Sequence, residues 1–228
     1  MHSLTKYIGG HGTSIGGIIV DGGNFDWIKD RKRQPLMNEP DQSYGGAIWA
    51  DAVPQLTGAN IPFAIRARVV LLRDLGAPLS PFNAWQIIQG LETVGLRMKQ
   101  HCANAEKVVT FLETQKKVQN VIYPTNHQGE IKDRALRYMK GGYGSLVGMD
   151  VGTRENGAKF IDNLKMLYHV ANIGDARSLA IHPATTTHSQ LSEKELLAAG
   201  VTPGYVRLSI GIEHPDDIIA DIKQALAA

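Results

Sequence analysis

The residues best suited to chemistry lie at the start of the chain. Lys6 follows two hydroxyl residues, Ser3 and Thr5, and precedes a glycine-rich turn. A lysine forms an imine with an aldehyde through its neutral amine, which a buried or cation-neighboured setting favours. The two hydroxyls could hydrogen-bond a phosphate, and glycines let the backbone approach a flat ring because they have no Cβ. Together these residue types suit pyridoxal phosphate (PLP).

Several ordered motifs carry a family resemblance. Residues 3–7, followed by Gly-Gly-His-Gly, resemble the cofactor-lysine segment of the Cys/Met-metabolism PLP-dependent enzymes. Later motifs of that family follow in the same order at residues 174–176, 178–189 and 206–213. The branch that the chain resembles most is the O-acetylhomoserine sulfhydrylase (homocysteine synthase) branch, through residues 71–76, 79–84 and 90–93.

The resemblance implies the fold and the domains. We expect an α/β, PLP-dependent transferase-like architecture, aminotransferase fold type I. Residues 1–117 would be the end of the large cofactor-binding domain, with the lysine loop and long helices. Residues 118–228 would be the small C-terminal α/β domain. Relatives have a further half that carries the ring-stacking tyrosine and the aspartate for the pyridine nitrogen, so we expect this chain to be a C-terminal portion.

The resemblance also implies roles for the residues that bind the cofactor. Lys6 would be the covalent cofactor lysine and would carry protons at the substrate's α and β carbons. Ser3 and Thr5 match phosphate contacts. Without the resemblance, these residues would be a surface lysine and two loop hydroxyls that cap local backbone groups.

Arg207 and Asn172 are the expected substrate-binding residues. Arg207 matches the family's substrate-carboxylate arginine, and a guanidinium can hold a carboxylate by two parallel hydrogen bonds. Asn172 falls where many relatives carry a serine near that carboxylate. Arg177 falls where cystathionine-cleaving relatives carry a glutamate, which disfavours a cystathionine substrate.

The implied parent enzyme is a PLP-dependent transferase that performs γ-replacement. It would make homocysteine and acetate from O-acetylhomoserine and sulfide, or methionine when methanethiol is the acceptor. A homotetramer is implied for the parent enzyme. Two alternatives remain: another family activity such as methionine γ-lyase or cystathionine γ-synthase, and an inactive C-terminal half that acts only as an association module.

Two other patterns suggest different chemistry and are weaker. Residues 12–16 match the Gly-x-Ser-x-Gly nucleophile pattern of α/β-hydrolases, but that pattern requires a strand before Ser14 and a helix after it. Here a strand-like run follows instead. His182 and His188 are six residues apart, which places them on one face of neither a helix nor a regular strand, so we expect no metal.

Composition is typical of a globular chain, with 43% hydrophobic and 20% charged residues. The 24 basic and 22 acidic residues give a net charge of +2 and are dispersed, so we expect no nucleic-acid or membrane partner. The lone Cys102 is expected in the core rather than as a nucleophile. These features favour the cytoplasm.

Periodicity predicts the elements that position these residues. Ser80 and Pro81 should begin a helix, and a long amphipathic helix should run from Leu96 through Leu112. We expect further helices near 155–164, at 192–199 with a capping box, and from Pro215. Expected strands are 15–20, 118–123, 145–151, 167–173, 178–181 and 205–212, and residues 21–44 should be a surface connection.

Overall fold

The computed structural model describes all residues from 1 to 228 and divides into two compact units. One unit comprises residues 1–3 and 16–84, and the other comprises residues 4–15 and 85–228. The larger unit contains the lysine loop together with the whole C-terminal part of the chain. The expected domain boundary at residue 117 stays a prediction.

The larger unit is built on a five-stranded mixed sheet. Its strand order is β3-β4-β7-β6-β5, and only the β5–β6 pair is parallel. The strands are β3 (Asn120–Ile122), β4 (Leu146–Asp150), β5 (Tyr168–His169), β6 (Leu179–Ile181) and β7 (Tyr205–Ser209). These confirm the strands expected near 118–123, 145–151, 178–181 and 205–212. The strand expected over 167–173 is only two residues long, since the chain leaves the sheet before the turn at Gly174.

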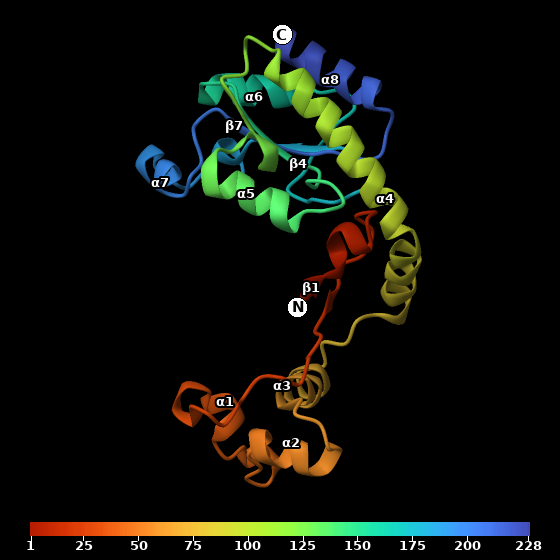
Figure 1. Cartoon of the computed structure of the whole chain (residues 1–228), viewed down its shortest axis with the longest axis vertical. Helices are drawn as coiled ribbons and strands as arrows, with labels where there is room; N and C mark the ends of the chain where they lie inside the picture. The colour runs from red at the N-terminus through yellow and green to blue at the C-terminus, as the bar shows by residue number, and fades with distance from the viewer. The chain divides into compact units, whose positions relative to one another are not determined.

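Helices α4 (Pro81–Glu113), α6 (Arg154–Asp162) and α8 (Pro215–Ala227) pack on one face of this sheet. Helix α5 (Gly129–Tyr138) lies on the other face, and the short helix α7 (Glu193–Ala198) lies to the side of the sheet (Figure 1). Helices α4, α6 and α8 share one core with alternate residues of the strands, such as Val147, Met149 and Leu208. The remaining residues of β4 and β7 point to the other face, on the side of α5.

Helix α4 begins where the sequence predicts, but the residues that it buries differ from the predicted apolar face. It begins at Pro81 as expected but continues unbroken to Glu113. Cys102 is buried, as predicted, whereas Leu96 is 71% exposed. Three polar residues lie buried on the inner side of this helix, namely Arg97, His101 and Asn104. The polar side chains are buried there because each has backbone acceptors within reach.

The caps of the last two helices form as the sequence predicts. Ser192 and Glu195 make a reciprocal capping box at the start of α7. Helix α8 begins with Pro215 and has two aspartates in its first turn, and its apolar face, including Ile218 and Ile222, is fully buried.

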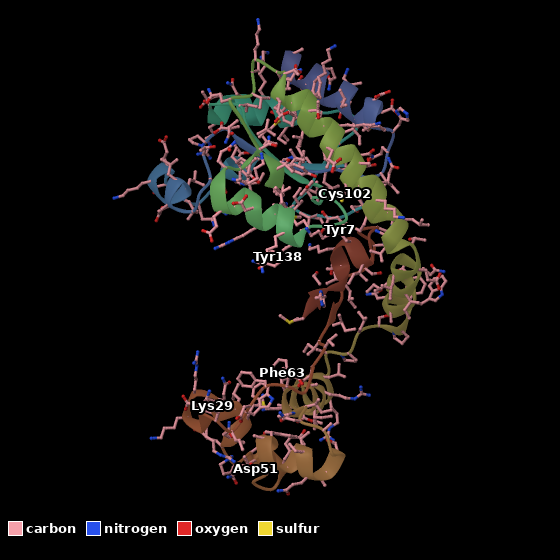
Figure 2. The ribbon with its side chains drawn as sticks, viewed as in Figure 1. Tyr7, Lys29, Asp51, Phe63, Cys102 and Tyr138 are labelled. Atoms are coloured by element: carbon pink, nitrogen blue, oxygen red, sulfur yellow. The ribbon has the colours of Figure 1, made fainter.

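The smaller unit contains short helices and one two-stranded ladder. Its elements are β1 (His2–Ser3), β2 (Gly17–Ile18), η2 (Arg31–Arg33), α1 (Pro35–Asn38), η3 (Gln42–Tyr44), α2 (Trp49–Thr57), α3 (Pro62–Arg66) and η4 (Ala67–Asp74). Its core contains Met37, Trp49, Ala50 and Val53. Trp27 packs against this core and stacks on Phe63, which is labelled in Figure 2, with ring centroids 6.0 Å apart.

Two predictions for the smaller unit are wrong. The strand expected at 15–20 is only β2, because its partner β1 ends where the chain turns into a helical segment at Leu4. Residues 21–44 are more than a surface connection, since they contain short helices and supply Met37 to the core. A few large apolar side chains without periodic spacing suffice to anchor such a segment.

None of the helices combines the length and the apolar character that crossing a membrane would require.

Candidate active site

The Lys6 loop is a short helical segment that ends in a tight turn. The segment η1 (Leu4–Ile8) is kinked at Lys6, where the backbone has φ −86° and ψ −134°. The amide of Gly9 donates to the Leu4 carbonyl at 2.8 Å, and the amide of Gly10 donates to the Lys6 carbonyl at 2.7 Å. Gly10 has φ +69°, a conformation that glycine adopts without strain. The turn therefore fixes the backbone on both sides of the lysine.

The Lys6 side chain ends at Asn172. Its Nζ donates to Asn172 Oδ1 at 2.5 Å. The backbone carbonyl of the same asparagine accepts a hydrogen bond from Arg207 Nη2 at 3.3 Å. One residue thus connects the lysine and the arginine, which are 201 positions apart in the sequence.

Tyr7 fastens the loop to the C-terminal sheet. Its hydroxyl lies 2.8 Å from Ser145 Oγ, and its ring meets His101 edge-on at a centroid distance of 5.5 Å. Figure 2 shows Tyr7 beside the turn of α4 that carries Cys102. Burial raises the pKa of Tyr7 more than the Ser145 hydrogen bond lowers it, so the hydroxyl stays protonated at neutral pH. A Cβ at Gly174 would lie 2.8 Å from the Tyr7 ring, so only glycine fits there.

Two contacts join the glycine turn to residues 174–177. The amide of Ala176 donates to the Gly10 carbonyl at 2.8 Å. A Cβ at Gly12, which has φ +63°, would collide with the carboxylate of Asp175. Asp175 is 4% exposed and lies 3.4 Å from Arg177 Nε, and this ion pair raises the pKa of Arg177. The Arg177 guanidinium also stands over the Tyr168 ring at 4.7 Å, so both contacts hold this side chain.

Arg97 reaches the loop from α4. It is 5% exposed, and its guanidinium donates to the carbonyls of Tyr7, Ile8 and Gly90 at 2.9, 3.2 and 2.6 Å. Burial lowers the pKa of Arg97. Arg97 lies outside the motifs that carry the family resemblance, although a charged residue in the inner stripe of a long helix is a signal in the sequence.

The two predicted phosphate residues lie in different compact units. Ser3 pairs with Gly17 in the β1–β2 ladder of the smaller unit. Thr5 belongs to η1 and lines a small hollow with residues of the glycine turn and of α4, including Gly9, Gly12 and Gln86. The structure therefore brings Lys6, Asn172 and Arg207 together, while the phosphate roles of Ser3 and Thr5 stay predictions.

The competing residues from the sequence are otherwise engaged. Ser14 is buried, and its hydroxyl donates to Gln86 Oε1 at 2.6 Å. His182 is fully buried between Thr185 Oγ1 at 2.9 Å and the Pro203 carbonyl at 2.8 Å. His188 Nδ1 lies 2.9 Å from Thr187 Oγ1. These contacts give Ser14 and both histidines structural roles in their loops, and no cluster of three or more His, Cys, Asp or Glu residues is present.

A comparison with known protein families agrees with this geometry. The family model described as Cys/Met metabolism PLP-dependent enzyme matches residues 1–227. The chain belongs to this family. An O-acetyl-L-homoserine sulfhydrylase of Leptospira meyeri is 50% identical over 231 residues, which cover 99% of this chain and 52% of that protein. A homocysteine synthase of Schizosaccharomyces pombe is 44% identical and is likewise covered over 52% of its length.

A solved member of the Cys/Met metabolism family has the same fold. The crystal structure of a protein named as an O-acetylhomoserine (thiol)-lyase, from Campylobacter jejuni, superposes with a TM-score of 0.84 at 40% identity. The match covers 100% of this chain and 53% of the Campylobacter jejuni chain, whose structure carries N′-pyridoxyl-lysine-5′-monophosphate. The expected α/β, PLP-dependent transferase-like fold is therefore confirmed. The chain spans about half the length of the family members that it matches.

The residues around Lys6 fit the PLP that this family uses. The amine is held by a neutral amide oxygen rather than by a carboxylate, so no ion pair has to break before the amine can react. A lysine that forms a covalent bond with an aldehyde needs such an available amine.

Proposed function

We propose that this chain supplies the lysine-bearing half of a PLP-dependent O-acetylhomoserine sulfhydrylase site. The observation that carries the proposal is the connection of Lys6 to Arg207 through Asn172. An amino-acid substrate needs an amine or aldehyde reaction partner close to a carboxylate anchor. Lys6 and Arg207 have those two chemistries, and one residue holds both.

The proposed reaction exchanges two groups on the γ carbon of the substrate. The bond between Cγ and the ester oxygen breaks, and acetate leaves with the electron pair. Hydrogen sulfide forms the new Cγ–S bond and gives up a proton, so the products are homocysteine and acetic acid. When bound, PLP supplies an electron sink for the α carbon.

Each residue of the chain would have one task. Arg207 would bind the substrate carboxylate by two parallel hydrogen bonds and so fix the direction of the Cα–H bond. Lys6 would remove the α proton and return protons at the neighbouring carbon. Asn172 would hold the Lys6 amine when it is not covalently bound. Ser3 and Thr5 would donate hydrogen bonds to the cofactor phosphate.

The test is a titration of the purified chain with pyridoxal phosphate, followed by its visible absorbance. A saturable band that Lys6→Ala abolishes would support the lysine assignment. Borohydride reduction and peptide mapping should then place the label on Lys6, with Lys132 of α5 as an internal reference. Labelling spread evenly over surface lysines would contradict the proposal. Synthesis of homocysteine would then be assayed after a complementary N-terminal half is added.

A second candidate function is association without catalysis, and the exposed side of α4 favours it. Ile88, Leu91 and Leu96 are 55%, 52% and 71% exposed on that helix. Apolar residues clustered on a surface helix are typical of an interaction site. Sedimentation that yields a defined oligomer, together with no Lys6-dependent band, would favour this candidate. The homotetrameric parent and the cytoplasmic location stay predictions.

A further inference from the structure

Arg97 is a buried cation whose acceptors are carbonyl and hydroxyl oxygens. Besides the carbonyls of Tyr7, Ile8 and Gly90, Arg97 Nε donates to Thr93 Oγ1 at 3.2 Å. A buried charge is costly unless hydrogen bonds satisfy it. Two of the carbonyls that accept hydrogen bonds from Arg97, those of Tyr7 and Ile8, directly follow Lys6 in the chain.

The helix surface beside Arg97 is shaped to receive the same carbonyls. A Cβ at Gly90 would lie 2.2 Å from the Gly9 carbonyl oxygen and 2.7 Å from that of Ile8. A Cβ at Gly10 would lie 2.0 Å from Arg97 Nη1. Gly90, which has no Cβ, and the planar guanidinium of Arg97 therefore form one binding surface on α4 for residues 7–10.

The opposite side of the loop is held by other elements. Tyr7 contacts Ser145, Lys6 contacts Asn172 and Gly10 contacts Ala176. The loop is therefore fixed between α4 and the C-terminal sheet, and Arg97 holds it from the α4 side with a charged group. A guanidinium fits this task because its donors diverge in one plane, whereas a lysine ammonium is a single point charge.

We propose that Arg97 is a positioning residue for Lys6, which holds the lysine loop on α4 so that the amine meets Asn172. The inference deepens the proposed function, and its test does not depend on pyridoxal phosphate. It assigns Arg97 no contact with the substrate or the cofactor. Its action is through the carbonyls of Tyr7 and Ile8.

The first readout is hydrogen exchange of the full chain. In Arg97→Met we expect the Gly9 and Gly10 amides to exchange at least about tenfold faster, because a lost charge-assisted bond is worth about 1.5–3 kcal/mol. The amides of β4 and β7 should change less than about threefold. Arg134→Met is the matched control, since Arg134 is an exposed arginine of α5 whose ion pair is with Glu130.

The second readout is the reactivity of Lys6 with an amine reagent, measured by mass spectrometry. Arg97→Met should speed the labelling of Lys6 and leave that of Lys132 unchanged. Arg97→Lys keeps the positive charge but lacks the planar set of donors, so the labelling of Lys6 should proceed at an intermediate rate. This variant replaces Arg97→Met in the test if the methionine variant fails to fold. Unchanged exchange and labelling, or equal acceleration across the whole sheet, would overturn the proposal.

The two proposals fail in different ways. If the unmodified chain gives no Lys6-dependent absorbance band, the proposed function of the chain fails, whereas the exchange result for Arg97 still decides its positioning role. If the band forms and Arg97→Met leaves the loop and the labelling of Lys6 unchanged, only the positioning role fails.

Discussion

Lys6 Nζ and Asn172 Oδ1 lie 2.5 Å apart, although the two residues are 166 positions apart in the sequence. The acceptor is a neutral amide on the segment between β5 and β6, and its own backbone carbonyl holds Arg207. Any change at this asparagine should therefore alter Lys6 before it alters the fold.

Replacing Asn172 should change the reactivity of Lys6 in opposite directions. Asn172→Leu removes the acceptor, and we expect Lys6 to react with an amine reagent about five- to tenfold faster, which corresponds to one lost hydrogen bond. Asn172→Asp introduces a carboxylate that favours the ammonium form, so labelling should slow. Mass spectrometry with Lys132 as reference measures both rates. Equal rates in the two variants would contradict the contact.

Two glycines of α4 should respond differently to alanine. Gly95→Ala should stabilise the chain by about 0.5–1 kcal/mol, because alanine favours a helix and no atom lies within 4 Å of the added Cβ. Gly90→Ala should instead cost about 1–3 kcal/mol, since its Cβ would displace the Gly9 and Ile8 carbonyls. Denaturant unfolding compares the pair. A stabilised Gly90→Ala variant would show that the loop does not sit on α4 as described.

Two buried histidines should make the chain less stable in mild acid. Burial lowers the pKa of His101 and of His182 below the ordinary value, despite hydrogen bonds to the carbonyls of Ile210 and Pro203 that act the other way. Below about pH 6.5 the unfolded chain therefore binds more protons than the folded chain. The free energy of unfolding falls by up to about 1.4 kcal/mol per pH unit for each histidine. Unfolding free energies at pH 7.5 and 5.5 measure this loss.

Substitution of one histidine tests the source of that acid sensitivity. His182→Asn should flatten the slope between pH 7.5 and 5.5, although the variant is less stable at both values. His11→Asn, at an exposed site, should leave the slope unchanged. If the control flattens the slope as much, the buried ring is not its cause.

Asp221 should stabilise the chain through its charged form. Its burial alone would raise the pKa, but three backbone amides of residues 165–167 and Gln224 donate to the carboxylate and together lower it. A lowered pKa means that this stabilisation is present above about pH 4 and is lost as the pH falls through the folded value. Asp221→Asn should cost about 2–3 kcal/mol at pH 7. The same substitution should also make the free energy of unfolding, measured with denaturant, depend less on pH between pH 5 and 3.

The sequence by itself determined much of the local structure. Pro81, the Ser192 and Glu195 pair, and Pro215 with its two aspartates each fix a helix start within a few residues, because caps and proline act locally. The ordered motifs led to the family, and the family match confirmed it.

Only the tertiary structure decided how the site is held. Lys6, Asn172 and Arg207 carry no spacing signal, because a hydrogen bond between distant segments depends on how strands and loops meet. The binding surface made by Arg97 and Gly90 likewise has no spacing signal. A polar residue and a glycine in a helix have this role only because the lysine loop packs on them. The predicted strand at 15–20 failed for a related reason. Its residues favour a strand, but strand length depends on the partner, and β1 is only two residues long.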